Sequence, residues 1–263
     1  MARLTGRTAL VTGAAGGLGA AMARALASAG ANLMISDIAE DGSCERLGSE
    51  LAAGFGVACG HHRADLADPA DVERLIAAAI DRFGSVEILI NNAVVRHFAP
   101  IDQFPLEHWD RALAVNLTAA FLATRRLLPV MRAAGYGRIF NMTSVYGFRG
   151  TANRVDYVTT KAALQGLTRA TAIEVAGEPV SCHALLPGTV QTPGVQVRID
   201  ALMAEEGLSR EEAERRFLAG KQPNGRFVDP ESVADVMLML CGPTGLDMNG
   251  AILPVDGGWL ARG

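Results

Sequence analysis

The stretch TALVTGAAGGLG, residues 8–19, decides the fold. A short apolar run typical of a buried strand leads into a glycine-rich turn, and a helical pattern follows through residue 29. Because glycine has no Cβ, Gly13, Gly17 and Gly19 allow a tight turn and let backbone N–H groups approach a phosphate at the start of the helix. Strand, glycine turn and helix in this order predict a dinucleotide-binding loop.

Further strand-like and helix-like segments alternate along the 263 residues. We predict strands at 8–12, 32–37, 57–63, 86–92, 138–144, 180–187 and 251–256. We predict helices near 17–29, 40–53, 69–83, 107–134, 155–176 and 230–241. Strands that alternate with helices form a parallel sheet covered on both faces. The sequence therefore predicts an α/β protein, with one domain over 1–263 and a Rossmann-type, doubly wound parallel sheet of about seven strands.

One segment, about 188–225, interrupts this alternation. It contains RIDALMAEEGLSREEAERRFLAG (198–220), which has the pattern of two short amphipathic helices. An insertion after the carboxyl end of a strand lies where a lid over a ligand would lie. We predict a small helical substrate lid; the alternative is a surface excursion that packs against a neighbouring subunit.

Composition narrows the class of protein. The formal net charge of −4 argues against nucleic acid as a partner. The sequence contains no run of 18 or more apolar residues, so we predict no membrane-spanning helix. The N-terminus has no secretory leader pattern, so we predict a cytoplasmic protein. The four cysteines (Cys44, Cys59, Cys182, Cys241) and the histidines His61, His62, His97 and His108 lack the spacing of metal ligands. We predict reduced thiols, structural histidines and no metal.

Asp37 stands at the end of the second predicted strand, about twenty residues after the glycine turn. A carboxylate there accepts hydrogen bonds from both ribose hydroxyls and repels a 2′-phosphate. No basic residue stands at Ala14, Ala15 or Gly16 to attract that phosphate. The pattern favours NAD over NADP, although Asp37 could instead cap a helix.

Tyr157 and Lys161 are four residues apart and share one face of a predicted helix. Tyrosine is a poor base near neutral pH because its unperturbed pKa is about 10, and a nearby ammonium favours the phenolate. Such a pair can act as a general base for an alcohol proton. Ser144 ends a strand thirteen residues earlier and could hold the substrate oxygen beside Tyr157.

Together these motifs resemble the short-chain dehydrogenase/reductase family over nearly the whole chain. The resemblance implies that Asn116, Ser144, Tyr157 and Lys161 are catalytic, with Asn116 (in LAVNLT) holding a water of the proton relay. The matching cofactor positions are Thr12, Gly13, Gly17, Leu18, Gly19, Asp37, Asp65, Leu66, Asn92, Ala93, Tyr157, Lys161, Pro187, Gly188, Val190 and Thr192. Val94 departs from the family, which usually has glycine after Asn-Asn-Ala, and could narrow the space for the cofactor.

Three segments, 97–105, 207–231 and 255–262, most resemble the 3-hydroxybutyrate dehydrogenase branch of that family. The positions that match those holding the substrate carboxylate there are Arg96, Tyr146, Arg154 and Arg198, and Ser144 is the further substrate-binding position, at the reacting oxygen. The branch has glutamine, histidine, lysine and glutamine at these four positions, so only Arg154 preserves the charge. Guanidinium binds carboxylate, sulfonate or phosphate in a bidentate manner, which predicts an anionic hydroxy or keto substrate. Alternatively, the arginines face solvent or pair with Asp156 and Asp200.

Several functions stay open at this point. The first is an NAD-dependent dehydrogenase of a small hydroxy acid like 3-hydroxybutyrate. The others are a sugar-acid or hydroxysulfonate dehydrogenase, a 3-oxoacyl reductase and, least favoured, a non-catalytic NAD-binding protein. The resemblance also implies a homotetramer formed through the long helices 107–134 and 155–176.

Overall fold

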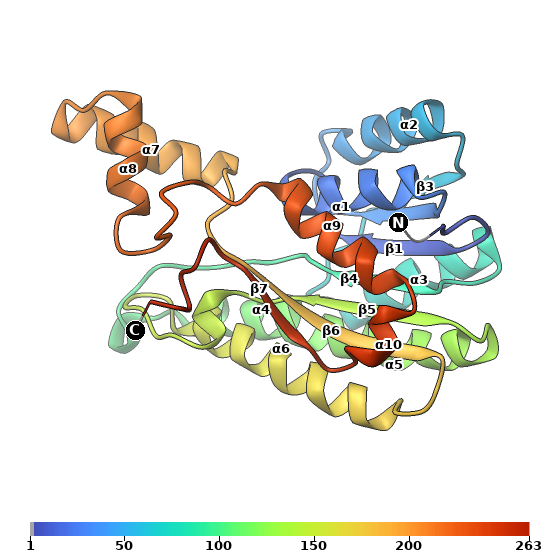
Figure 1. The fold of residues 1–263 in the computed structure, drawn as a ribbon. Coiled ribbons are helices and arrows are strands. Elements are labelled where there is room, and N and C mark those ends of the chain that lie inside the picture. The colour runs from blue at the N-terminus through green and yellow to red at the C-terminus, as the bar shows by residue number, and fades with distance from the viewer. Residues whose placement is uncertain (1–2, 263) are drawn as a thin grey trace.

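The computed structural model describes residues 3–262, and a parallel sheet of seven strands forms its centre (Figure 1). The strand order is β3-β2-β1-β4-β5-β6-β7, so the direction of winding reverses between β1 and β4. The strands are β1 (Thr8–Thr12), β2 (Asn32–Ser36), β3 (Cys59–His61), β4 (Ile88–Asn91), β5 (Gly137–Met142), β6 (Val180–Pro187) and β7 (Ile252–Val255). All seven predicted strands are confirmed. In open α/β sheets, ligands bind at such a reversal, outside the carboxyl ends of the strands.

Helices cover both faces of the sheet. They are α1 (Gly17–Ser28), α2 (Ser43–Phe55), α3 (Pro69–Phe83), α4 (Leu106–Leu113), α5 (Ala119–Ala133), α6 (Val155–Glu174), α7 (Pro193–Glu206), α8 (Arg210–Leu218), α9 (Pro230–Cys241) and α10 (Thr244–Asp247). One apolar core joins α1, α2 and α9 to the sheet, and a second core joins α3, α5 and α6 to its other face. Burial on both faces explains why the strands are almost continuously apolar.

The predicted helix 107–134 is continuous but not uniform. A π-helical turn, Ala114–Thr118, separates α4 from α5. The stretch Leu106–Ala133 is long and apolar enough to meet a length and composition test for a membrane span. Core helices meet the same test, and Leu127 and Met131 of this helix are fully buried against the sheet.

The helical pair α7 and α8 stands apart from the sheet, beyond the carboxyl end of β6 (Figure 1). It has a small apolar cluster of its own that includes Ile199, Phe217 and Leu218. A single bridge between Val190 and Val228 joins the two ends of the insertion. The two predicted amphipathic helices are confirmed, and the segments around Val190 and Val228 connect them to the rest of the domain.

Candidate active site

A cleft of about 1090 Å³ opens along the carboxyl ends of the strands. Asp37 and Asp65 lie at one end, which we call the acidic end. The other end, beneath α7 and α8, is lined by four cationic side chains, and we call it the cationic end: Arg96, Arg154, Arg198 and Lys221. The cleft exceeds the 300–1,000 Å³ usual for a single small ligand, so it has room for a large cofactor and a second molecule.

The glycine loop needs its glycines for close backbone contact. Gly13 has φ of +64°, and a Cβ there would lie 2.8 Å from Cα of Ala93. A Cβ on Gly19 would overlap the carbonyl oxygen of Gly13. Gly17, with φ of +55°, and Leu18 line the cleft at the first turn of α1. The loop therefore presents free N–H groups of a helix N-terminus to the cleft, as a phosphate site requires.

Side chains from β1 and β4 hold this loop in place. The Thr12 hydroxyl accepts the N–H groups of Asn92 (3.1 Å) and Ala93 (3.2 Å) and donates to the carbonyl of Ile90 (3.1 Å). The Asn92 amide donates to the carbonyls of Thr12 (3.0 Å) and Gly13 (2.9 Å). Thr12 and Asn92, which are about 80 residues apart in sequence, thus hold the backbone of the glycine loop against the segment that follows β4.

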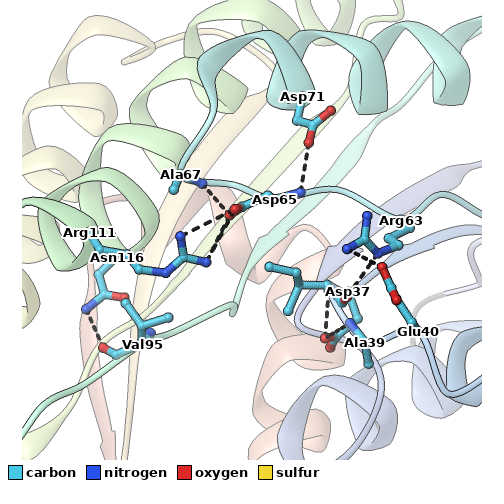
Figure 2. Close-up of polar contacts among 11 residues, drawn as sticks. Asp37, Ala39, Glu40, Arg63, Asp65, Ala67, Asp71, Val95, Arg111 and Asn116 are labelled. Atoms are coloured by element: carbon cyan, nitrogen blue, oxygen red, sulfur yellow. Dashed lines mark hydrogen bonds and ion pairs between the residues drawn. The ribbon is translucent and has the colours of Figure 1, made fainter. Parts of the chain in front are cut away.

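The Asp37 carboxylate is held by backbone groups. It accepts the N–H of Ala15 at 3.0 Å and the N–H of Ile38 at 2.8 Å. It also accepts the N–H of Ala39 at 3.2 Å (Figure 2). Gly42 caps α2, so the alternative that Asp37 caps a helix is wrong. Arg63, which the sequence analysis missed, lies beside Asp37 in Figure 2 and pairs with Glu40 at 2.7 Å.

Asp65 has an ionic partner from a distant helix. Its carboxylate lies 3.2 Å from a guanidinium nitrogen of Arg111 on α4 and accepts the N–H of Ala67 at 3.0 Å (Figure 2). Its own N–H donates to Asp71 at 3.1 Å. Leu66 follows Asp65 in the cleft wall. Sequence reasoning missed Arg111 because nothing local links it to Asp65, 46 residues earlier.

Ser144, Tyr157 and Lys161 come together at the middle of the cleft. Ser144 and Tyr157 line it, and the Ser144 hydroxyl accepts the N–H of Tyr146 at 3.3 Å. The Lys161 ammonium donates to the carbonyl of Met142 at 2.6 Å and lies 5.5 Å from the centre of the Tyr157 ring. Burial, reinforced by the charge of Arg96, lowers the pKa of Lys161 to about 7. Its charged form therefore needs further acceptors nearby.

Asn116 lies within the π-helical turn. Its side chain accepts the N–H of Val95 at 2.8 Å and donates to the carbonyl of Val95 at 2.9 Å and to the Thr160 hydroxyl at 3.2 Å. Figure 2 shows the contact with Val95. Single π-helical turns are frequent at functional sites, and this one turns an amide toward the loop after β4.

Val94 is accommodated without backbone strain. Among residues 3–262, Asn153 is the only non-glycine residue with positive φ, so Val94 does not adopt a conformation that favours glycine. Its side chain is 42% exposed and forms part of the cleft wall. The departure from the family pattern therefore changes the shape of the wall and leaves the backbone path intact.

The segment after β6 closes the cleft opposite the glycine loop. Pro187, Gly188, Val190 and Thr192 all line the cleft. A Cβ on Gly188 would lie 2.9 Å from Cα of Asp256, so this glycine permits close packing. The Thr192 hydroxyl accepts the N–H of Val195 at 3.3 Å and caps α7.

The predicted anion-binding residues also meet in the cleft. Arg154 is the central one: its Cζ lies 4.6 Å from the Tyr157 ring centre and 5.0 Å from that of Tyr146. Burial lowers the pKa of Arg154, while Tyr157 and Tyr146 oppose that shift. Trp259 is buried, lines the same end and packs edge-on against Tyr146, with 5.3 Å between ring centres.

The acids that could have neutralised the arginines have other partners. Asp156 is buried and accepts the N–H of His97 at 3.0 Å, and Asp200 accepts from the Gln196 amide at 2.6 Å. Within residues 3–262, Arg96, Arg154 and Arg198 make no ion pair, so the alternative that Asp156 and Asp200 pair with them is wrong.

Histidines and cysteines contribute other kinds of contact. His97 and His108 stack on each other, with ring centres 3.9 Å apart and an interplanar angle of 9°. All four cysteines are free thiols, and burial raises the pKa of Cys182 and Cys241 to about 12. Over the part of the chain that the structure describes, no three His, Cys, Asp or Glu side chains gather as metal ligands would.

Known proteins resemble this chain over its whole length. The family described as Enoyl-(Acyl carrier protein) reductase matches residues 13–260. D-beta-hydroxybutyrate dehydrogenase of Cupriavidus necator is 40% identical, with 98% of this chain and 100% of the relative covered. The enzyme of that name from Rhizobium meliloti is 35% identical, with 97% and 99% covered. L-sorbose reductase from Gluconobacter frateurii, solved with NADPH and L-sorbose, has a TM-score of 0.93 at 28% identity, with 99% of both chains covered.

The predicted fold, the order of the motifs and these relatives agree. The structure has the sheet order, the glycine loop and the Ser144, Tyr157 and Lys161 constellation in one cleft. The relatives cover nearly every residue at 35–40% identity, and they are dehydrogenases that act on CH–OH groups. This chain is an oxidoreductase of the short-chain dehydrogenase/reductase family.

Proposed function

We propose that this protein is an NAD-dependent dehydrogenase that interconverts a small anionic secondary alcohol and its ketone, with a 3-hydroxybutyrate-like hydroxy acid as the model substrate. The observation that carries the proposal is the position of the Tyr157 ring, whose centre lies 5.5 Å from the Lys161 ammonium and 4.6 Å from the unpaired guanidinium of Arg154. The D-beta-hydroxybutyrate dehydrogenases among the relatives support this class of substrate.

The residues present fit a nicotinamide dinucleotide. The glycine loop leaves space that a Cβ would fill, and its N–H groups suit the pyrophosphate. Asp37 would hold the adenosine ribose, Asp65 and Leu66 the adenine, and Lys161 the second ribose. Pro187, Gly188, Val190 and Thr192 would hold the carboxamide end. When bound, the nicotinamide supplies the hydride acceptor.

In the proposed mechanism, the Tyr157 hydroxyl is the general acid/base at the substrate oxygen. In its deprotonated form it takes the proton from the alcohol, and Ser144 holds that oxygen in position. Lys161, buried behind the ring, stabilises negative charge on Tyr157 when protonated. Asn116 positions the backbone around Val95 and would hold the water through which the proton leaves.

The choice of NAD over NADP rests on Asp37. Its carboxylate already accepts three backbone N–H groups and would face a 2′-phosphate with like charge. The L-sorbose reductase was solved with NADPH, so the fold itself does not exclude a cofactor with a 2′-phosphate. Arg63 lies near enough to Asp37 to matter once that carboxylate is removed, because its Nε donates to the carbonyl of Ile38 at 3.2 Å.

We also propose a homotetramer in the cytoplasm. Phe121 on α5 and Ile173 on α6 expose 47% and 78% of their surface, on the two helices expected to pair between subunits. Because exposed apolar side chains on the same pair of helices favour association, multi-angle light scattering should give four times the mass of 27.6 kDa. A monomer would contradict this assembly.

The first test is a panel assay with a matched variant. NADH formation is measured with both 3-hydroxybutyrate enantiomers, their methyl esters, sugar acids and hydroxysulfonates, and NADH oxidation is measured with 3-oxoacyl thioesters. We expect the acids to react at least tenfold better than the esters, and Tyr157→Phe to lower kcat about 1,000-fold without weakening NAD binding. Full activity in Tyr157→Phe, or equal rates for acids and esters, would contradict the proposal.

A further inference from the structure

Lys221, which the sequence analysis did not single out, is the fourth cation of the cationic end. Lysine occurs at only two positions in the chain, Lys161 and Lys221, against 22 arginines. Lys221 lines the cleft just after α8, and Lys161 is buried beside Tyr157 of the cleft wall. The lid thus adds a second kind of cation to an end that already has three guanidinium groups.

The four charges fall into two groups. Arg154 stands beside the Tyr157 ring, where the proposed reaction takes place. Arg198 and Lys221 instead flank one ring, that of Phe217 on α8, at 4.9 Å and 3.7 Å from its centre. Arg96 extends toward the start of α7: if Gly194 carried a Cβ, that atom would lie 3.4 Å from a guanidinium nitrogen of Arg96. One cationic position therefore adjoins the reacting centre, and a second lies under the lid.

No carboxylate compensates this charge. The acids that line the cleft, Asp37 and Asp65, both lie at its other end. Other arginines of the described chain do form ion pairs: for example, Nε of Arg132 lies 2.7 Å from a carboxylate oxygen of Glu178. Burial, followed by the charges of Arg198 and Arg154, lowers the pKa of Lys221 to about 8. Arg154 and Lys221 are half-buried, whereas Arg96 and Arg198 are exposed. Half-buried like charges without an acidic partner are costly, so this end favours a ligand with matching negative charge.

We propose that the substrate is a dianion: a hydroxy acid whose first carboxylate binds Arg154 and whose second oxyanion group, a carboxylate or a phosphonate-like group, binds Arg198 and Lys221. This inference rests on the proposed function and narrows its substrate class. A monocarboxylate such as 3-hydroxybutyrate would neutralise Arg154 and leave the pair at Phe217 without a partner. A second oxyanion held by that pair would also draw α7 and α8 toward the main body.

The test uses substrates that differ only in the second group. They are 3-hydroxyglutarate, its monomethyl ester, its dimethyl ester, 3-hydroxybutyrate and the analogue in which a phosphonate replaces one carboxylate of 3-hydroxyglutarate. We expect kcat/KM for the diacid to exceed that of the half-ester at least tenfold. Comparison of the diacid with the phosphonate then identifies which oxyanion the second position prefers. The inference would be overturned if kcat/KM for the diacid were within twofold of that for its half-ester and kcat/KM for the phosphonate were no higher.

Variants of Lys221 locate the second position. Lys221→Met keeps the packing on Phe217, so we expect it to remove the tenfold advantage of the diacid over its half-ester. Lys221→Arg should restore the advantage because it restores the charge. Arg215→Met removes an exposed charge of α8 outside the cleft and is the matched control. NAD affinity, measured for each variant, verifies the fold. An equal effect of Lys221→Met on both substrates would overturn the assignment.

The outcomes separate this inference from the proposed function. If the half-ester and 3-hydroxybutyrate react much better than the dimethyl ester, but the diacid brings no further gain, the substrate is a monoanion and only the dianion inference fails. If the dimethyl ester reacts as well as the acids, the anion pocket itself fails, and with it the proposed substrate class.

Discussion

The two ends of the cleft treat charge in opposite ways. At the acidic end, Asp37 accepts backbone N–H groups and Asp65 pairs with Arg111, so each carboxylate already has partners within the protein. At the cationic end, Arg154 and Lys221 have aromatic rings as neighbours and, within residues 3–262, no acid. Both ends are built around ionised side chains, yet only at the acidic end do hydrogen bonds or an ion pair within the protein satisfy them.

The difference indicates how each end recognises its ligand. A carboxylate whose charge is already balanced can still accept hydrogen bonds from hydroxyl groups, so it suits neutral parts of a ligand such as ribose and adenine. Guanidinium and ammonium groups without an acid favour a ligand that brings the missing charge. Under the proposed function, we therefore expect hydrogen bonding to select the cofactor and charge to select the substrate.

The largest effect should come from the cationic end. Arg154→Met removes the buried partner of the substrate carboxylate, and loss of one member of such a pair costs 2–5 kcal/mol, so we expect kcat/KM for hydroxy acids to fall about 100-fold. NAD binding, measured by titration, should change less than twofold. Arg149→Met, a nearby arginine outside the cleft, is the control. An equal loss with the methyl ester would mean that Arg154 acts on Tyr157 and not on the anion.

The corresponding change at the acidic end is Asp37→Ser. Hydrogen bonds to charged groups contribute about 1.5–3 kcal/mol, so KM for NAD should rise about 30-fold, while KM for the hydroxy acid at saturating cofactor stays the same. NADP should become a usable cofactor because the like charge is gone and Arg63 is near. The double variant Asp37→Ser with Arg63→Ala should lose that gain. A cofactor preference that Asp37→Ser leaves unchanged would refute this view of the acidic end.

Local patterns were enough to predict the framework of the molecule. The strand, glycine turn and helix at residues 8–19 and the spacing of Tyr157 and Lys161 depend on contacts within a few turns of chain, so sequence alone identified them. The two helices of the insertion also follow a local pattern, 3.6-residue periodicity with a serine cap at Ser209. Such features need no knowledge of the tertiary fold.

Contacts between distant segments could not be predicted in this way. Arg111 meets Asp65 because the fold brings α4 to the segment that follows β3, and Lys221 comes near Arg198 because α8 packs against α7. The π-helical turn at Asn116 was also missed, because one widened turn does not alter the apolar periodicity of a long helix. These residues give the two ends of the cleft their different charge balance, so the comparison itself required the structure.

A pH series sharpens the comparison at the cationic end. The groups that face Lys221 are Arg198 on α7, Arg154 at the start of α6 and the Phe217 ring, and its pKa is lowered to about 8 from 10.5. Lys221 is therefore charged below pH 8 and loses its charge as pH rises, so KM for 3-hydroxyglutarate should rise about five- to tenfold between pH 7.5 and 9.5. Dividing KM for 3-hydroxyglutarate by KM for 3-hydroxybutyrate removes effects of Tyr157 and Lys161, because their ionisation would affect both substrates equally.

Lys221→Arg provides the control for this pH series. Its guanidinium stays charged over the whole range, so the ratio of the two KM values should become independent of pH. A ratio that rises equally in the parent protein and in Lys221→Arg would assign the titration to another group.

The smallest effect should come from Arg111→Leu at the acidic end. The pair with Asp65 is 40% and 35% exposed, and exposed ion pairs contribute about 1 kcal/mol or less. Asp65 would still accept the N–H of Ala67, so we expect KM for NAD to rise only two- to fourfold, with KM for the hydroxy acid unchanged. Calorimetric titration of NAD into the two proteins measures this directly. A loss above tenfold would mean that Arg111 holds the cofactor by its charge, and the two ends would then recognise their ligands in the same way.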